Sequence, residues 1–400
     1  MTWRCYPPVL SPVSTRALVD GIGAAIGLRR GSNAAVAAIL RHRYRATDAL
    51  LTDSGTSALI LALRKMLPRG GTVAYPAYAC IDLTAAAVAT GVRVRLYDLD
   101  PATMSPDLDS VRATIRRGVD AIVVAHLYGY PADMAGVRKL AAEQGIPVIE
   151  DAAQGAGGTL NGELLGSLGE VAILSFGRGK GTTGGKGGAI LVKTPALAEW
   201  TRHARSDLKP GSRGGVTILS LAAQRVLSHP SLYRLPSSIP GLRLGEMVYH
   251  APHPPLGMSG ASAAVLRQTL GLEEREVTDR RARAKDVLSR MHDAPNVTPV
   301  RPIAGAEPGF LRLAFLDSDG TRISRPDLGA LRGYPMTLDE HSQLRALLLP
   351  GERAGKGSQF LRDRLFTVPT HSHVDQTFFA GLAEWFEAQR TEPHGIVALS

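Results

Sequence analysis

The chain has 400 residues, enough for two or three domains of ordinary size, and 44% of them are hydrophobic. This composition excludes a disordered chain, a coiled coil and a collagen-like fibre, because the 43 Gly and 26 Pro are spread without a period. The formal net charge of +10 favours anionic partners. The basic residues are scattered rather than gathered in one tract, so we expect no nucleic-acid partner.

The cysteine content and the hydropathy pattern indicate where the protein resides. Only Cys5 and Cys80 are present, and neither lies in a Cys/His cluster with zinc-binding spacing, so we expect no metal site and a reducing compartment. The first 30 residues lack the pattern of a signal peptide, and no apolar run approaches the ~20 residues of a spanning helix. The sequence therefore predicts a cytoplasmic protein.

From residue 47 onward, short apolar runs alternate with longer helical patterns, which is typical of an α/β domain with a largely parallel sheet. The expected strands are 49–52, 72–75, 92–97, 121–125, 146–149, 171–175 and 189–192, and the expected helices are 57–65, 81–89, 105–117, 134–143 and 195–205. We predict that residues 1–40 form an N-terminal segment and that residues 41–205 form the large cofactor-binding domain.

The second half of the chain predicts a connecting arm and a smaller domain. Prolines interrupt residues 206–253, although 214–227 is apolar enough for a helix that clasps a dimer or borders the active site. We favour that interpretation over a helix that rests on a membrane surface. Residues 254–400 predict a small α+β domain, with helices at 260–270, 274–292, 323–332, 358–364 and 376–389 and a strand at 310–315.

Asp151 follows directly on the apolar strand that ends in Val148-Ile149-Glu150. Ligands of open α/β sheets bind beyond the carboxyl ends of the strands, so a functional acid belongs at this position. Asp is also a favoured N-cap of helices. This motif alone therefore leaves a functional acid and a structural cap equally open.

Residues 176–189 form a glycine-rich loop between two strands of buried type, and the loop contains Lys180 and Lys186. Glycines allow backbone N–H groups to approach an anion closely. A lysine in such a loop either contacts phosphate or, when partly desolvated, acts as a Schiff-base nucleophile. A flexible RNA-binding loop is the weaker interpretation, because strands bracket the segment on both sides.

Residues 51–59 predict a strand, a tight turn of Ser54-Gly55-Thr56-Ser57 and the start of a helix. Such a turn presents N–H and hydroxyl groups that suit a phosphate, although an ordinary capped turn would look the same. The order of phosphate turn, carboxylate and lysine along the chain provides the groups that pyridoxal 5'-phosphate requires for its phosphate, its ring nitrogen and its aldehyde.

Further motifs accompany these three, and together they resemble the DegT-type nucleotide-sugar aminotransferases, which are fold-type-I pyridoxal-phosphate enzymes. The motifs are Ser54–Leu59, Tyr75–Tyr78, His126–Met134, Glu150–Gln154, Gly166–Glu170 and Ser175–Phe176. The resemblance runs from about residue 14 to 205 and continues more faintly beyond. It implies an α/β fold with a mostly parallel central sheet, a smaller α+β C-terminal domain, and a homodimer whose active sites lie at the subunit interface.

The resemblance also implies roles for single residues. Lys180 matches the Schiff-base lysine, Asp151 the partner of the pyridinium nitrogen, and Gln154 the side chain beside the cofactor's phenolic oxygen. The phosphate cradle matches Gly55, Thr56, Ser57 and Ser175. His126 falls in a family motif too, but we interpret it as a packed core histidine.

Four positions depart from the family pattern. Cys80 stands where an aromatic that stacks on the cofactor ring is usual, so either Tyr78 substitutes for it or stacking is weaker. The family's Asn-x-Arg-Met appears as Pro255–Met258, and the acidic residue of its last glycine loop as Lys186. The residue after the lysine, often Asn, is Gly181.

The resemblance implies an aminotransferase that moves an amino group from glutamate or glutamine to a ketone of a nucleotide-linked sugar, in polysaccharide or natural-product biosynthesis. Two alternatives stay open: a pyridoxal-phosphate-dependent dehydratase or other eliminase, and a cofactor-binding scaffold without catalysis. Against the dehydratase, the similar sugar dehydratases have histidine at the position of Lys180. We expect nucleotide-sugar and amino-acid substrates and a homodimer.

Overall fold

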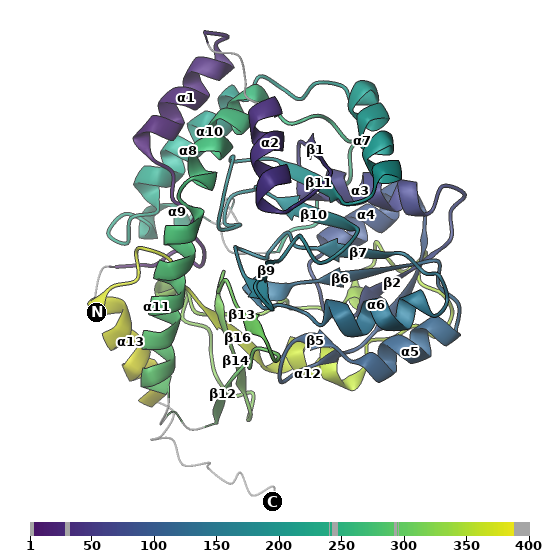
Figure 1. Ribbon diagram of the computed structural model, residues 1–400. Helices are drawn as coiled ribbons and strands as arrows, with labels where there is room; N and C mark the ends of the chain where they lie inside the picture. Colours follow the sequence, from purple (N-terminus) through teal and green to yellow (C-terminus); the bar gives the residue numbers. More distant parts are fainter. Residues whose placement is uncertain are drawn as a thin grey trace, which may run out of the picture.

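The computed structural model describes residues 4–28, 33–239, 241, 247–291, 294 and 296–387. Its centre is a seven-stranded sheet, covered on both faces by helices (Figure 1). The sheet contains β1 (Asp48–Thr52), β2 (Thr72–Pro76), β3 (Arg93–Tyr97), β6 (Ala121–Ala125), β7 (Val148–Asp151), β10 (Val171–Ser175) and β11 (Gly188–Val192). The helices of the first half are α1 (Thr15–Ala25), α2 (Asn33–Arg43), α3 (Gly55–Met66), α4 (Asp82–Thr90), α5 (Leu108–Arg116), α6 (Met134–Ala142) and α7 (Pro195–Asp207).

The sheet has the order β1-β11-β10-β7-β6-β2-β3 and is parallel from β10 to β3. β11 runs antiparallel to both of its neighbours, so β1 points in the same direction as β10. The carboxyl ends of β1, β6, β7 and β10 therefore lie at one edge of the sheet, where ligands of such folds bind. The expected mostly parallel sheet is confirmed, and each expected strand lies within two residues of an observed one.

Alternation of side chains along the strands produces two buried faces. On one face, Ile173 of β10 packs in a core with α3, α4 and α7. On the other face, its neighbour Leu174 packs with α2 and α10 (Gly260–Leu270). Further along that second face, α5 and α6 cover β6 and β2. Helix α10 thus packs against the large sheet, although the boundary drawn from the sequence at residue 254 assigns it to the small domain.

The C-terminal part forms a smaller α+β unit (Figure 1). Its sheet has the order β12-β14-β16-β15, and an aromatic core of Phe315, Phe366 and Trp385 joins it to helices α11 and α13. The elements are α11 (Glu273–Met291), β12 (Val297–Pro299), β14 (Leu313–Asp317), β15 (Leu331–Arg332), α12 (Lys356–Arg364), β16 (Leu365–Val368) and α13 (Gln376–Glu387). Two further small sheets are present among the described residues: β4 (Leu99–Asp100) pairs with β5 (Ser105–Pro106), and β8 (Thr159–Leu160) lies between β9 (Glu163–Leu164) and β13 (Ala306–Glu307).

The predicted helix over residues 323–332 is wrong. Residues Pro326–Leu328 form one 3₁₀ turn, and Leu331–Arg332 form strand β15. Gly329 follows the turn in the left-handed conformation, at φ 62°, which ends the turn and lets the chain enter the strand. The expected strand at 310–315 begins three residues later, at Leu313.

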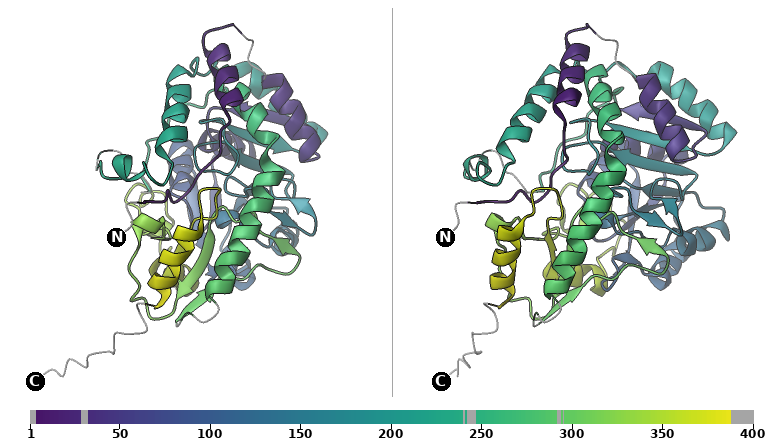
Figure 2. Two further views of the ribbon diagram at one scale, coloured as in Figure 1. Left: turned by 90° about the vertical axis from the view of Figure 1, so that its left-hand side faces the viewer. Right: turned by 60° about the vertical axis from the view of Figure 1, so that its left-hand side comes forward.

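The connecting arm contains two helices, α8 (Gly215–Leu227) and α9 (Arg234–Ser237). Ile218 and Leu221 of α8 pack with α1 and α10 in a small core, and the views of Figures 1 and 2 show the three helices together. Val216, Leu219 and Val226 of α8 are exposed. Within the described residues, no helix combines the length and the apolar character that crossing a membrane requires. The cytoplasmic location stays a prediction.

The N-terminal segment lies along the small domain before it reaches the large one (Figure 2). Arg4 forms an ion pair of 2.8 Å with Asp375, and the Tyr6 hydroxyl donates to the same carboxylate at 2.6 Å. Further along, the Ser11 hydroxyl accepts a hydrogen bond of 3.0 Å from the Gly179 N–H. The segment therefore connects the small domain to the glycine-rich loop of the large domain.

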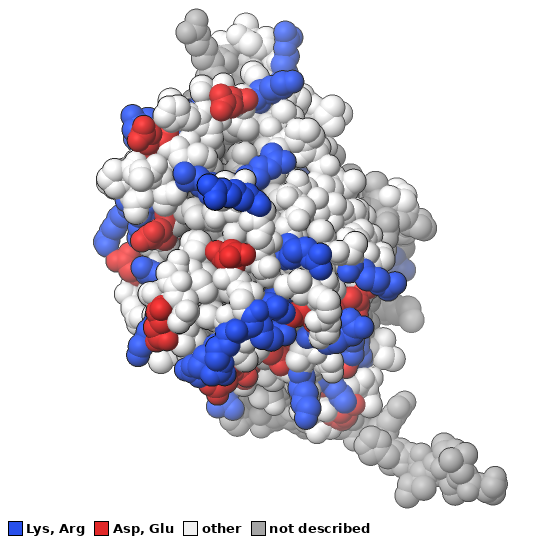
Figure 3. All heavy atoms as spheres, turned by 90° about the vertical axis from the view of Figure 1, so that its right-hand side faces the viewer, with Lys and Arg blue, Asp and Glu red and all other residues white. Residues whose placement is uncertain are grey.

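On one face of the molecule, basic and acidic side chains lie interspersed. Figure 3 shows the side of the molecule that carries α4, α5 and α7, where Lys and Arg lie with Asp and Glu between them. Oppositely charged neighbours reduce the field of such a surface. The mixture of basic and acidic side chains therefore does not favour binding of an extended polyanion to this face.

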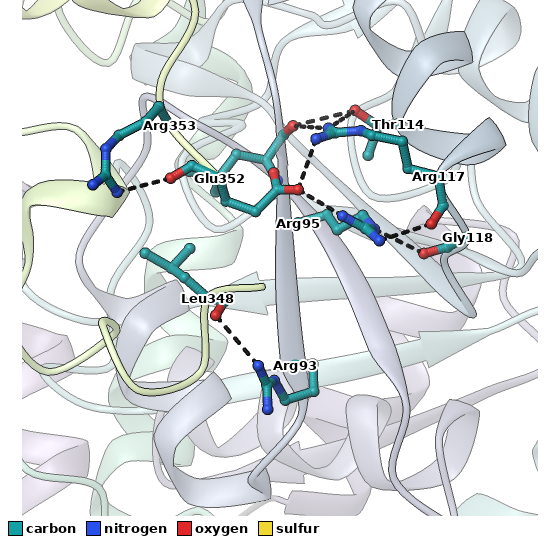
Figure 4. Close-up of polar contacts among 9 residues, drawn as sticks. Arg93, Arg95, Thr114, Arg117, Gly118, Leu348, Glu352 and Arg353 are labelled. Carbon is teal, nitrogen blue, oxygen red and sulfur yellow. Dashed lines mark hydrogen bonds and ion pairs between the residues drawn. The ribbon is translucent and has the colours of Figure 1, made fainter. Parts of the chain in front are cut away.

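A buried carboxylate fixes the C-terminal part to the edge of the large sheet (Figure 4). Glu352 Oε1 accepts from Arg95 at 2.8 Å and from Arg117 at 2.7 Å, and Oε2 accepts from the Leu96 N–H at 2.9 Å. Beside it, the Leu349 N–H donates to the carbonyl of Val94 at 3.1 Å, so this segment extends the sheet beyond β3.

We expect Glu352→Ala to lower the free energy of unfolding by about 3 kcal/mol, because the guanidinium groups of Arg95 and Arg117 lose their shared partner at a buried site. Urea unfolding followed by circular dichroism measures this change. The control is Glu163→Ala, which removes an exposed pair with Arg45 and should cost about 0.5 kcal/mol or less. Equal losses in the two variants would contradict the role of Glu352.

Candidate active site

A cavity of about 500 Å³ opens at the carboxyl edge of the large sheet. Residues that follow β6, β7 and β10 and the first turn of α3 line it, together with residues from the start of α4. The lining residues are Gly55, Thr56, Leu59, Cys80, Asp82, Leu83, Ala125, His126, Leu127, Asp151, Ala153, Gln154, Ile173, Ser175 and Lys180.

The phosphate turn predicted from the sequence begins helix α3. Ser54 is the N-cap, and its hydroxyl oxygen accepts from the Ser57 N–H at 3.0 Å. Gly55 lies so close to β10 that a Cβ added to it would be 2.8 Å from Cβ of Ser175. Helix N-termini present unpaired N–H groups and favour negative charge. Gly55, Thr56 and Ser175 line the cavity, whereas Ser57 is buried behind the turn.

Asp151 ends β7 and lines the cavity between β6 and β10. Its Oδ1 accepts from the Ala153 N–H at 3.0 Å. Burial raises the pKa of this carboxyl above its usual range, and the hydrogen bond from Ala153 and the charge of Lys180 counteract the increase. A buried carboxylate in this position is stabilised by a cationic ligand group opposite it.

Lys180 also lines the cavity, and the loop that carries it is held from several sides. The Thr182 hydroxyl donates to buried Glu273 of α11 at 2.7 Å, and the Thr183 hydroxyl donates to the carbonyl of Phe176 at 3.1 Å. Gly179 and Gly181 both have a φ of 79°, which other residues adopt at a cost. These contacts fix the loop on both sides of the lysine.

His126 is buried and hydrogen-bonded through both ring nitrogens, and it also lines the cavity. Nδ1 accepts from the Ala132 N–H at 2.9 Å, so Nε2 carries the proton and donates to Glu150 at 3.1 Å. Glu150 accepts in addition from three N–H groups of the 166–169 loop. Our interpretation of His126 as a packed histidine agrees with these bonds, but its ring forms part of the wall as well.

Gln154 is fixed by two bonds that the sequence did not indicate. Its Oε1 accepts from the Tyr128 N–H at 3.0 Å, and its Nε2 donates to the Tyr334 hydroxyl at 2.6 Å. The rings of Tyr128 and Tyr334 stack at a centroid distance of 5.3 Å. Tyr334 lies 180 residues from Gln154 in the small domain, so no local pattern could have identified it.

Cys80, not Tyr78, lines the cavity. The Tyr78 side chain is buried, and its hydroxyl accepts from the Tyr334 N–H at 2.7 Å. The Cys80 thiol donates to Asp82 at 3.5 Å, and burial raises its pKa to about 12. A neutral thiol therefore occupies the place of the usual stacking aromatic, where sulfur can still contact a ring.

These residues fit pyridoxal 5'-phosphate. The start of α3 with Ser175 suits the phosphate, Asp151 suits a protonated ring nitrogen, and Lys180 suits the aldehyde. When bound, the cofactor would supply an electron sink for reactions at an amino acid's α-carbon. Among the described residues, no three His, Cys, Asp or Glu side chains gather as a metal ion would require.

The fold and the cavity define the class of the protein: its architecture is that of the fold-type-I aminotransferases. Crystal structures of such enzymes superpose on nearly the whole chain; one example is DesI in the presence of its TDP-sugar product, with a TM-score of 0.75 and 19% identity over 98% of this chain and 94% of that one. The particular family follows from the sequence. Residues 32–215 match the DegT/DnrJ/EryC1/StrS aminotransferase family, so the chain contains a domain of that family.

Several curated relatives are named as aminotransferases or transaminases. The L-glutamine:2-deoxy-scyllo-inosose aminotransferase of Streptomyces kanamyceticus is 33% identical over 48% of this chain and 46% of its own length. The dTDP-3-amino-3,4,6-trideoxy-alpha-D-glucose transaminase of Streptomyces venezuelae is 38% identical over 41% of this chain and 44% of its own. The chain thus spans less than half the length of these two relatives.

Proposed function

We propose that the protein is a pyridoxal-phosphate-dependent aminotransferase that transfers an amino group from glutamate or glutamine to the ketone of a nucleotide-linked sugar. One observation carries the proposal: Lys180, Asp151 and the first turn of α3 line a single cavity at the carboxyl edge of the sheet. Relatives named as sugar transaminases support the reaction type.

The residues of the cavity have separate tasks in this reaction. Asp151 would hold the protonated ring nitrogen, and Gln154, whose amide is fixed by Tyr334, would contact the cofactor from the wall of the cavity. Lys180 binds the cofactor covalently and, once an amino donor has displaced it, moves a proton between the donor's α-carbon and the cofactor. The hydrogen bonds of Thr182 and Thr183 hold the loop that carries this lysine.

Two features favour transamination over the alternatives. A lysine at position 180 can bind the cofactor and transfer the proton, whereas the similar sugar dehydratases have histidine there. The intact arrangement of Lys180, Asp151 and the phosphate turn argues against a scaffold that has lost its chemistry. The sugar and its nucleotide belong to the proposal alone, since one relative's printed name specifies an inosose and another's a dTDP-sugar.

The visible absorbance of the purified protein with pyridoxal 5'-phosphate tests the proposal. We expect a yellow band from the lysine-bound cofactor, and we expect glutamate or glutamine to bleach it as the amino group is transferred. A keto sugar added afterwards should restore the band. A band that persists with every amino donor would favour the scaffold, and a protein that takes up no cofactor would contradict the proposal.

A further inference from the structure

Gln154 reaches the cavity with an amide group whose orientation is fixed by the fold. The Tyr128 N–H can only donate a hydrogen bond, so the atom that it meets at 3.0 Å is the amide oxygen of Gln154. Nε2 therefore points to the Tyr334 hydroxyl, at 2.6 Å. An amide nitrogen carries two N–H groups, and among the described residues Nε2 bonds to Tyr334 alone. One N–H of Gln154 is thus left for an acceptor in the cavity that this residue lines.

The chemistry of the cofactor indicates which acceptor this N–H would meet. In the proposed function, the start of α3 takes the phosphate, Asp151 takes the ring nitrogen and Lys180 takes the aldehyde. The phenolic oxygen is the polar atom of the cofactor ring that these groups leave without a partner. A hydrogen bond donated to an ionised oxygen favours its anionic form. Gln154 is therefore suited to stabilise negative charge on the phenolic oxygen.

Tyr334 is held by contacts to both domains. Its backbone N–H donates to the Tyr78 hydroxyl of the large domain at 2.7 Å. The N–H of the preceding residue, Gly333, donates to the carbonyl of Leu365 in strand β16 at 2.8 Å. The Tyr334 ring packs against the rings of Tyr78 and Tyr128, at centroid distances of 5.2 and 5.3 Å. These contacts place the Tyr334 hydroxyl without any contribution from the amide that it holds.

The Tyr334 hydroxyl is a neutral partner for the amide. Tyr334 is buried, and burial raises its pKa well above 10, so the hydroxyl keeps its proton at neutral pH. Tyr334 does not line the cavity, whereas Gln154 does. Its effect on a ligand in the cavity therefore passes through the amide of Gln154.

We propose that Tyr334 is a positioning residue of the reaction, which holds the Gln154 amide so that its free N–H donates to the phenolic oxygen of the cofactor. The inference rests on the proposed function, since the cofactor supplies that oxygen. It also gives the small domain a part in the reaction, because Tyr334 follows strand β15. A displacement of this segment would release the amide and alter the charge on the phenolic oxygen.

The wavelength of the visible band of the cofactor-loaded protein tests the inference. Light absorption moves charge away from the phenolic oxygen, so loss of an N–H that stabilises this charge should move the band to longer wavelength. Tyr334→Phe removes the hydroxyl and keeps the ring and the backbone bond to Tyr78. We expect this shift in Tyr334→Phe, and bleaching by glutamate or glutamine should slow roughly fivefold, as for one lost hydrogen bond.

A double variant shows whether Tyr334 acts through Gln154. Gln154→Ala removes the donor itself, so its band should lie at longer wavelength than that of the wild type. We expect no further shift when Tyr334→Phe is added to Gln154→Ala, because two residues that act as one unit have non-additive effects. Shifts that add in the double variant would show that Tyr334 acts independently of the amide, and they would overturn the inference.

Tyr130→Phe is the matched control for a role in packing alone. Tyr130 is buried in the same core as Tyr334 and does not line the cavity, and its hydroxyl accepts from the Ala314 N–H at 3.2 Å. This variant also loses a buried hydrogen bond, so its melting temperature should fall while its band stays in place.

Two negative results have different meanings. If Tyr334→Phe lowers the melting temperature and leaves the band unmoved, as in Tyr130→Phe, the inference is wrong and the proposed function stands. If the wild-type protein forms no yellow band, the proposed function is wrong, and the inference falls with it.

Discussion

Lys180→Ala is expected to abolish turnover, with a fall in kcat of about 10⁴-fold or more, because one side chain both binds the cofactor and transfers the proton. The cavity contains no other lysine that could take over, since Lys180 is the one lysine of its lining. The yellow band should disappear, while the cofactor still binds through its phosphate and ring nitrogen. Stopped-flow absorbance with glutamate measures the loss.

Chemical trapping identifies the lysine independently of activity. Borohydride reduction of the wild-type protein with its cofactor, followed by peptide mass spectrometry, should place the modification on Lys180. Lys139→Ala removes an exposed lysine on α6 that does not line the cavity, and it should leave the band and the rate unchanged. Modification at Lys186, six residues further along the same loop, would contradict the assignment.

The large domain could be predicted from its sequence because its strands are buried and short. Ala121–Ala125 and Val171–Ser175 have the bounds expected of them, since apolar runs between turn residues define parallel strands well. The same rule placed Asp151 and Lys180 at one edge of the sheet. The cavity confirms their proximity, because both residues line it.

The features that local sequence patterns missed depend on distant contacts. The helical pattern over 323–332 gave way to a turn and strand β15, which pairs with β16 about 35 residues further on. Tyr334 fixes Gln154 from the other domain. The Tyr78 hydroxyl accepts from the Tyr334 N–H, again across the two domains, and Tyr78 is absent from the cavity lining. Hydrophobic periodicity describes one segment at a time, so it cannot predict contacts between residues that are far apart in the sequence.

Asp151→Asn is expected to lower kcat by about 10²–10³-fold, because the ring nitrogen loses the charge that keeps it protonated. The fold should tolerate the change. Burial raises the pKa of Asp151 above 3.8, so the folded state favours the protonated carboxyl. The contribution of this group to folding stability is therefore fully present below pH 3.8 and is lost as the pH rises through the raised pKa. At neutral pH the buried, ionised carboxylate disfavours folding. The variant should therefore melt no earlier than the wild type.

The affinity for pyridoxal 5'-phosphate gives a pH signature for this carboxylate. In the wild type the binding form is the ionised one, so affinity should fall as the pH is lowered toward the raised pKa of Asp151, while the Asn variant should lack that part of the dependence. Titrations of both proteins with pyridoxal 5'-phosphate, followed by absorbance, measure the affinity between about pH 4.5 and 8. This range begins just above the usual pKa of Asp. Gln154→Ala changes a neutral neighbour in the same cavity and should weaken binding without altering the pH profile. If the affinity for pyridoxal 5'-phosphate varied with pH in the same way in the wild type and the Asn variant, Asp151 would not be the partner of the ring nitrogen. The carboxylate of Asp82, which also lines the cavity, would then be the group to test.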